Sequence, residues 1–487
     1  MSLSRRKFLN KLSASGSLAA ALSLADTPAL ARGEAASVRS RHGDTLQRPS
    51  SPRTHASAAG APAVGNLNLS VAQIETTWVK VPMRPVPARR MFAENYEWSY
   101  FQVHKVTLGC GVVGFGETMP FYTWGRPTEE SYAYARGRNA AESMWNDSLG
   151  AGLQMALFDA VAKANDVPVY RLLGSQVRDR AFISWWDLDM SGEDWVAECR
   201  EAQAQGYTAF KTRARPWRDL VEDCGALAKT LPPYFTLDMD FNDFLLDVSH
   251  ATEVLQELAV FPNVAAFETP IPQGDVAGNR FLRSQTRVPI AMHYGSPPVM
   301  TALKEDVCDV FVVGGGASAL LQTGAVAAMA NKPFWLQLVG TGITAAWALH
   351  FAAVLSHATW PAVNCHQLFV HPMCKPGITV TNGTAAIPDQ PGLGFSPDEN
   401  AAEKYRIEPL ARQPAPPEAL MAVRWPTGAA NYYAYKDQYW SDFRSGRLPV
   451  FAKGVRFEYI PDNGSQQWKE LHERAKKSPV FSTQSIL

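Results

Sequence analysis

Residues able to do acid–base chemistry stand at the ends of four successive strand-like segments in the middle of this chain. Segment 207–213 ends in Lys211 and Arg213, segment 234–242 in Asp238, Asp240 and Asn242, segment 263–268 in Glu268, and segment 288–294 in His293 and Tyr294. Polar groups at the carboxyl ends of successive parallel strands mark the active-site face of a β/α barrel. A lysine followed by acids on the next two strands indicates a base beside a divalent metal site. This combination favours removal of a proton next to a carboxylate.

The elements that must position these residues are predicted by an alternation of short apolar runs with amphipathic stretches. This alternation is typical of βα units and a parallel sheet, and eight strands close a barrel, so we predict an α/β fold with a TIM-like (β/α) barrel. A doubly wound open sheet would bring a glycine-rich turn after its first strand, and the sequence has none there. The predicted strands are 181–186, 207–211, 234–240, 263–268, 288–293, 309–313, 333–338 and 361–366. The predicted helices are 192–204, 217–230, 248–259, 276–285, 298–305, 317–330 and 342–356.

Three further regions flank the predicted barrel, which with its closing segment spans 176–405. Residues 67–175 combine strand-like runs with helical segments and predict an α+β capping domain. Residues 32–66 are rich in Ser, Ala, Arg, Pro and Gly and predict a flexible linker. Residues 406–487 are polar and aromatic, with a predicted helix near 465–477, and form a C-terminal extension to which the sequence assigns no role.

The first 31 residues predict an export signal of the twin-arginine type. Residues 4–9 (SRRKFL) resemble the twin-arginine motif, an apolar stretch follows near 11–25, and residues 29–31 (ALA) form a small-x-small cleavage site. We expect cleavage near Ala31, transport by the twin-arginine export machinery, and a periplasmic or secreted mature protein.

The composition argues against several function classes. The chain has 46 Lys and Arg against 46 Asp and Glu, so zero net charge gives no reason to expect binding to nucleic acid or an anionic membrane. No apolar run after residue 35 is long enough for a transmembrane anchor. The six cysteines contain no Cys-x-x-Cys pair, so we expect buried free thiols rather than a zinc ribbon.

Four features resemble the enolase superfamily, specifically its mandelate racemase and muconate lactonizing branch. They are GFGET (114–118), the helical segment 152–174, the Lys, Asp, Glu series on predicted strands two to four, and IPDQPGLGF (387–395). The resemblance implies an enolase-type barrel with a capping domain, and abstraction of the proton α to a carboxylate while bound Mg²⁺ stabilises the enediolate. Many such barrels are oligomers, which leaves a homo-oligomer open.

The resemblance also implies roles for single residues. Lys211 takes the general-base position, and Arg213 stands where the family often has a second lysine. We expect this neighbouring cation to lower the pKa of Lys211, and Arg213, which stays protonated, to orient a carboxylate. His293 is the third expected catalytic residue, and His293, Tyr294 or His366 would be the acid for a leaving hydroxyl.

Two of the expected metal ligands are acids on neighbouring strands. Asp240 is the expected first ligand because Asp240-Phe241-Asn242 reproduces the family's Asp-x-Asn, and Glu268 in FETPIP is the second. Asp238 lies on the same side of its strand as Asp240 and competes with it.

The fifth predicted strand departs from the family pattern, because PIAMHYG has no third carboxylate. Tyr294 aligns with the missing acid, and neutral tyrosine is a poor ligand for Mg²⁺. His293 is either a third ligand, which would favour Mn²⁺ or Zn²⁺, or a core or hydrogen-bonding histidine.

Strands six and seven depart as well. Gln337 stands where mandelate racemase-like members have a histidine, which argues against a two-base racemase. The glycine-rich turns 314–316 and 340–342 are either tight turns or anion sites for a substrate. Trp185 resembles a stacking wall for a substrate ring, although either Trp185 or Trp186 should face the outer helices. The residues expected to bind substrate are Trp185, Tyr294, Gln337 and Asn242.

The leading hypothesis is an exported enzyme that acts on a small-molecule carboxylate, as a sugar-acid dehydratase or another lyase. One alternative is a catalytically silent barrel that binds a ligand or serves a structural role. A second alternative is a racemase or cycloisomerase of the same superfamily.

Overall fold

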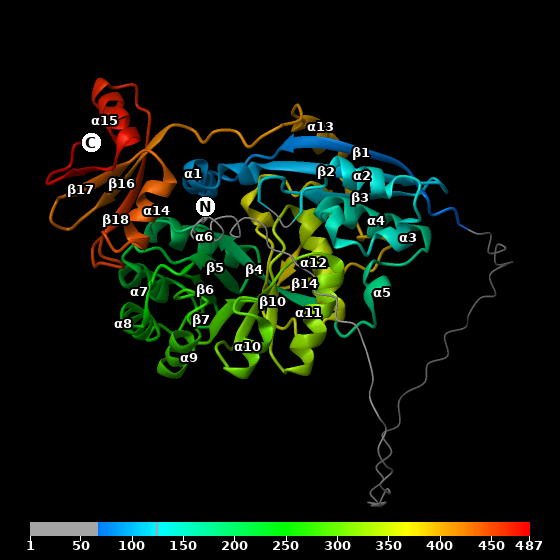
Figure 1. Ribbon diagram of the computed structural model, residues 1–487, viewed down its shortest axis with the longest axis horizontal. Coiled ribbons are helices and arrows are strands. Elements are labelled where there is room, and N and C mark those ends of the chain that lie inside the picture. The colour runs from blue at the N-terminus through cyan, green and yellow to red at the C-terminus, as the bar shows by residue number, and fades with distance from the viewer. Residues whose placement is uncertain (1–66, 123–124) are drawn as a thin grey trace, which may run out of the picture. The chain divides into compact units, whose positions relative to one another are not determined.

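The computed structural model describes residues 67–122 and 125–487 (Figure 1). The predicted export signal (1–31) and linker (32–66) lie outside the described residues. Among the helices of the described part, none is both long and apolar enough to span a membrane. All six cysteines are free thiols and five of them are buried, as predicted.

A three-stranded antiparallel sheet begins the described chain, with α4 packed against it. The sheet and helix can touch closely because β3 carries two glycines: a Cβ at Gly114 or Gly116 would lie 2.2 Å from a backbone oxygen of α4. Close packing of β3 on α4 therefore explains the two glycines of the GFGET segment. The strands are β1 (Val71–Lys80), β2 (Tyr100–Leu108) and β3 (Val113–Thr118). The helices are α1 (Pro85–Glu94), η3 (Tyr96–Ser99), α2 (Glu129–Ala135), α3 (Ala140–Ser143), η4 (Asp147–Leu149), α4 (Ala151–Ala164) and α5 (Tyr170–Leu173).

The central sheet is the predicted α/β barrel. Its parallel strands follow chain order from β4 to β10, and β11 pairs with β4. A parallel bridge between Gln337 and Val363 joins the segment after β10 to β11, so the sheet curls back on itself. The strands are β4 (Arg180–Asp187), β5 (Ala209–Arg213), β6 (Thr236–Asp240), β7 (Val264–Glu268), β8 (Ile290–His293), β9 (Val310–Val313), β10 (Phe334–Leu336) and β11 (Ala362–Val363).

Helices connect the barrel strands at the predicted places, and side-chain caps set where several of them begin. The cap oxygen accepts a hydrogen bond from an N–H of the first turn that would otherwise lack a partner. Four of these caps are Ser191, Asp219, Asp247 and Asp275. The helices are α6 (Gly192–Ala204), α7 (Leu220–Thr230), α8 (Val248–Leu258), α9 (Val276–Gln285), α10 (Val299–Lys304), α11 (Ala317–Met329) and α12 (Gly342–Val354).

Short elements follow the last barrel strand. The strands β13 and β14 form a hairpin, and β14 extends the sheet by pairing antiparallel to β4. The elements are η5 (His366–Leu368), β12 (Cys374–Lys375), β13 (Val380–Thr381), β14 (Thr384–Ala386), β15 (Ser396–Pro397) and α13 (Glu399–Lys404).

The C-terminal extension folds into a four-stranded antiparallel sheet with two helices, which we call the C-terminal sheet. One face packs on Trp217 and Phe244, which lie in the segments after β5 and β6, and the other face packs on α15. The C-terminal sheet therefore covers part of the barrel face on which the candidate site lies. Its elements are β16 (Ala419–Arg424), β17 (Ala430–Tyr433), α14 (Lys436–Arg444), β18 (Arg456–Pro461), α15 (Gln466–Lys477) and β19 (Val480–Ser482).

Two acids of the N-terminal domain, the buried Glu117 and the partly buried Asp147, occupy the glycine-rich turns of the barrel. Glu117 on β3 accepts hydrogen bonds from the backbone N–H of Thr341 at 2.7 Å and of Thr344 at 3.0 Å, where α12 begins. Asp147 accepts from the N–H groups of Ser318 at 3.0 Å and Ala319 at 2.9 Å, where α11 begins. These turns do bind anions, but the anions are the protein's own carboxylates rather than a substrate.

The Glu117 contact predicts a large effect on stability. Glu117→Ala leaves the N–H and hydroxyl donors of Thr341 and Thr344 buried without their acceptor, which should lower the free energy of unfolding by about 3 kcal/mol. Urea unfolding followed by circular dichroism measures this loss, with Glu129→Ala, at an exposed position of α2, as the control. Equal unfolding midpoints for the two variants would contradict this account of the domain junction.

Candidate active site

Strand register brings the predicted lysine and acids together inside the barrel. Lys211 on β5 pairs with Asp238, and Arg213 pairs with Asp240 on β6, which pairs with Glu268 on β7. Paired residues of neighbouring strands point to the same face of a sheet. These side chains therefore converge at the carboxyl ends of β5, β6 and β7.

Lys211 lies at the centre of this group. Its Nζ is 2.6 Å from Glu268 Oε2 and 3.8 Å from Asp240 Oδ2. It also donates a hydrogen bond of 2.7 Å to Gln337 Oε1. Gln337 was expected to bind substrate, but in the structure it holds the lysine.

The charges of Lys211 and Glu268 stabilise each other. Burial by itself lowers the pKa of Lys211, but the charges of Glu268 and Asp240 outweigh burial and raise this pKa. Burial by itself raises the pKa of Glu268, but Lys211 and His293 outweigh it and lower that pKa to about 2. The resting site therefore holds an ammonium next to a carboxylate, and the expected lowering of the lysine pKa by Arg213 is wrong.

His293 takes the inward position at the end of β8. Its Nε2 is 3.0 Å from Glu268 Oε1, and its side chain is 42% exposed. Burial acts to lower the pKa of His293, but contact with the Glu268 carboxylate outweighs burial and raises it. Tyr294, as the next residue, points to the opposite face and packs on Phe311 with 5.4 Å between ring centroids. The expectation that Tyr294 binds substrate is therefore wrong.

Asp240 is held by its own turn. Its two carboxylate oxygens accept hydrogen bonds from the backbone N–H and side-chain amide of Asn242 at 2.9 and 3.0 Å. Asn242 in turn accepts a hydrogen bond of 2.7 Å from Arg215. Asn242 thus orients Asp240. We expected its amide group to bind substrate, but Asp240 and Arg215 occupy it. Asp238 lies one step deeper, where burial raises its pKa to about 7, and it forms no ion pair with a described residue.

The donors do not fit the Mg²⁺ ion that the family resemblance implies. The described residues contain no group of three His, Cys, Asp or Glu side chains placed to hold a metal ion. The oxygens of Asp240 and Glu268 already face the N–H groups of Asn242, Lys211 and His293. At the third ligand position, β8 offers the imidazole of His293, whereas Mg²⁺ prefers oxygen ligands.

Arg213 lies next to a stacked pair of tryptophans at the edge of the site. Its guanidinium lies 5.9 Å from the ring of Trp98 and 5.5 Å from that of Trp186, and the two rings stack at 5.1 Å. Trp185 points the other way, and its Nε1 donates a 3.0 Å hydrogen bond to Glu198 on α6. The tryptophan that faces the site is Trp186, and the assignment of Trp185 to substrate binding is wrong.

Contacts outside the barrel centre bear on one further expectation and add two residues that were not expected. His366 bonds Tyr207 at 3.0 Å, and burial lowers its pKa to about 4, so it is neutral and unsuited to donate a proton. Glu94 and Asn95 contact Arg213, at 3.5 and 3.0 Å, and were not predicted. They come from the C-terminal end of α1, far from the barrel in sequence, and no local pattern marks them.

The mismatch with Mg²⁺ predicts how metal binding responds to mutation. Lys211→Met removes the ammonium that neutralises Asp240 and Glu268, so affinity for Mn²⁺ should rise about tenfold or more. Titration calorimetry with Mg²⁺ and Mn²⁺ measures this, with Lys229→Met, an exposed lysine on α7, as the control. One Mg²⁺ per wild-type chain, lost in Glu268→Gln, would contradict the account of the donors.

Comparison with known proteins shows what the barrel resembles. Residues 194–401 match the family model described as enolase C-terminal domain-like. The arabinonate dehydratase of Saccharolobus solfataricus is 24% identical over 275 residues, which cover 53% of this chain and 72% of that protein. Muconate cycloisomerase 1-2 of Acinetobacter lwoffii is 24% identical over 69% of this chain and 96% of its own length.

Solved structures share the fold. The muconate lactonizing enzyme from Pseudomonas fluorescens, complexed with muconolactone, superposes with a TM-score of 0.59 at 20% identity, over 70% of this chain and 100% of that one. Its fold corresponds to the curled sheet and the antiparallel N-terminal sheet described above. In sequence and fold the matched residues are thus similar to the enolase superfamily, in the branch that includes the muconate cycloisomerases.

Proposed function

We propose that this protein removes the proton next to the carboxylate of a small substrate, and that its reaction is the dehydration of a sugar acid. The observation that carries this proposal is the position of Glu268 between Lys211 Nζ and His293 Nε2, at 2.6 and 3.0 Å. One buried carboxylate thus contacts both a candidate base and a candidate acid, the two groups that elimination of water requires. Relatives named arabinonate dehydratase and D-xylonate dehydratase support this choice of reaction.

Three cationic side chains make the site suited to an anionic substrate. They are Lys211, Arg213 and His293. The Nη1 of Arg213 is bonded to Asn95, while its Nη2 and Nε donate no hydrogen bond to any described residue. A planar guanidinium with free donors binds a carboxylate in two-point fashion.

Proton abstraction begins with a proton shift inside the Lys211–Glu268 pair. A substrate at the barrel mouth excludes water, and exclusion of water favours the neutral amine and carboxylic acid over the ion pair. Lys211 passes one proton to Glu268 across 2.6 Å and becomes a neutral base. Its Nζ then takes the α proton of the substrate, and Arg213 and protonated His293 stabilise the enediolate.

The same proton shift prepares His293 to act as the acid. Neutral Glu268 no longer holds up the pKa of His293, so the imidazolium gives its proton more readily. The C–O bond to the leaving hydroxyl breaks as His293 protonates it, and water departs. On product release Glu268 loses its proton to solvent and His293 regains one, which restores the starting charges.

Two other functions stay as alternatives with distinct signatures. The protonated resting state of Lys211 also suits a barrel that binds a carboxylate without turnover. The relatives named muconate cycloisomerase and L-Ala-D/L-Glu epimerase point to an isomerase. An isomerase would exchange solvent deuterium into substrate without loss of water, whereas a binding barrel would do neither.

The proposed base predicts the effect of removing its amine. Lys211→Met should reduce turnover by about 10³-fold or more, because no other described group lies in its place. The assay incubates D-gluconate, D-xylonate and arabinonate with enzyme and detects loss of one water by mass spectrometry. Turnover in this variant equal to that of Lys229→Met would contradict the mechanism. Wild-type binding without turnover would favour the silent barrel.

The proposed acid predicts an alkaline limb in the pH profile. Contact with Glu268 raises the pKa of His293 above its usual 6.5, and only the protonated form donates. The ratio kcat/KM, which reports the free enzyme, should therefore fall as pH rises through this raised pKa. His293→Gln should lose this limb and turn over about 10²-fold more slowly, whereas exposed His250→Gln should keep both. An unchanged limb in His293→Gln would rule out its role as the acid.

A further inference from the structure

Glu94 is a buried carboxylate where the N-terminal domain, the barrel and the C-terminal sheet meet. It is 3% exposed and ends α1. Its Oε1 is 3.5 Å from Arg213 Nη1. Its Oε2 accepts hydrogen bonds from the hydroxyls of Tyr439 at 3.3 Å and Tyr459 at 3.1 Å. One carboxylate thus connects a cation of the candidate site to two tyrosines of the C-terminal sheet.

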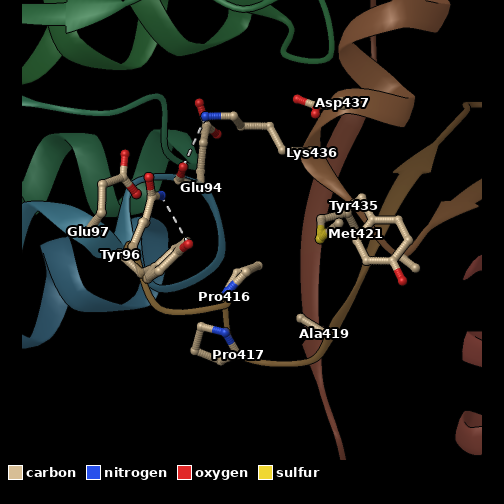
Figure 2. Close-up of a pocket in the computed structure, with 12 residues that line it drawn as sticks. Glu94, Tyr96, Glu97, Pro416, Pro417, Ala419, Met421, Tyr435, Lys436 and Asp437 are labelled. Atoms are coloured by element: carbon tan, nitrogen blue, oxygen red, sulfur yellow. Dashed lines mark hydrogen bonds between the residues drawn. The ribbon is translucent and has the colours of Figure 1, made fainter. Parts of the chain in front are cut away.

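Tyr439 and Tyr459 keep their hydroxyl protons and so remain hydrogen-bond donors to Glu94. Tyr439 lies on α14 and Tyr459 on β18, and burial, together with Glu94, raises the pKa of each well above 10. Lys436, also on α14, donates a 3.1 Å hydrogen bond to the backbone carbonyl of Glu94 (Figure 2). The C-terminal sheet therefore holds both the side chain and the backbone of Glu94.

The position of Glu94 decides how Arg213 is presented. The Arg213 side chain is only 13% exposed, and its Nη1 is shared between Asn95 and the long contact to Glu94. A buried carboxylate without other donors would move onto the guanidinium and take up more of its N–H groups. Because Tyr439 and Tyr459 share the charge of Glu94, the outer N–H groups of Arg213 stay available.

We propose that the C-terminal extension positions Arg213 to bind the substrate carboxylate, with Glu94 as the link. In this arrangement Arg213 contacts the substrate, and Glu94, Tyr439 and Tyr459 are positioning residues. The inference rests on the proposed carboxylate substrate for its purpose, but the positioning itself can be measured without any substrate. It gives the C-terminal extension a role that the sequence did not reveal.

The test removes the two hydroxyls and reads Arg213 directly. In the double variant Tyr439→Phe/Tyr459→Phe, Glu94 should close onto Arg213. Modification of Arg213 by phenylglyoxal, located by peptide mass spectrometry, should then slow severalfold. Affinity for D-gluconate, measured by calorimetry, should fall about tenfold. The matched control is Tyr433→Phe, which removes a buried hydroxyl from the same sheet, bonded to Asp442 at 3.0 Å. Its values should equal those of wild type.

A second variant, Glu94→Gln, should change the reactivity of Arg213 in the opposite direction. Glu94→Gln still accepts hydrogen bonds from Tyr439 and Tyr459 but loses the charge that attracts Arg213, so phenylglyoxal should react faster with Arg213. Thermal melts identify any variant that fails to fold. Arg213 reactivity equal to the Tyr433→Phe control in both variants would overturn the inference. If reactivity changes as expected but wild type binds no D-gluconate, positioning stands and the proposed carboxylate substrate falls.

Discussion

The contact between Lys211 and Glu268 is the constraint on which the rest of the site depends. Both side chains are buried inside the barrel, 2.6 Å apart, and either charge alone would cost several kcal/mol in that environment. The register of β5, β6 and β7 brings them together. On β8 the side chain of His293 points into the barrel and contacts the other oxygen of the Glu268 carboxylate. The acid–base properties of the site follow from this one buried group of charges.

Carboxylates of the N-terminal domain also join the parts of the molecule to one another. Glu117 and Asp147 of the N-terminal domain occupy the starts of two barrel helices, and Glu94 joins the α1 turn to the barrel and the C-terminal sheet. Each carboxylate is held by several donors, so each contact fixes a geometry as well as supplying stability. The candidate site is therefore built by three regions, although its reactive groups come from the barrel alone.

Sequence reasoning predicted the parts of the structure that local periodicity encodes. The alternation of apolar runs and helices predicted every barrel strand, and the polar strand ends predicted Lys211, Asp240 and Glu268 as neighbours. Which of two neighbouring residues in a strand points into the barrel was harder to infer. His293 and Tyr294, like Trp185 and Trp186, differ only in which face they take, and a shift of one residue reverses that choice. Glu94 and Asn95 could not be predicted, because their contacts with Arg213 join segments far apart in the chain.

The role of the glycine-rich turns shows a related limit. The sequence left open whether they are tight turns or anion sites for a substrate, and it did not reveal that Glu117 and Asp147 would fill them. The C-terminal extension gave even less information, since its strands are short and its core aromatics pack on Trp217 and Phe244 of the barrel segments. Tertiary contacts of this kind are absent from local patterns.

The most direct measurement is infrared difference spectroscopy on binding of D-gluconate, which detects the carbonyl band of a protonated carboxylic acid. The account predicts that this band appears in the wild-type protein when ligand binds and is missing in Glu268→Gln, because Lys211 passes its proton to Glu268. A spectrum without this band, or the same band in Glu268→Gln, would contradict the proton shift on which the proposed mechanism rests.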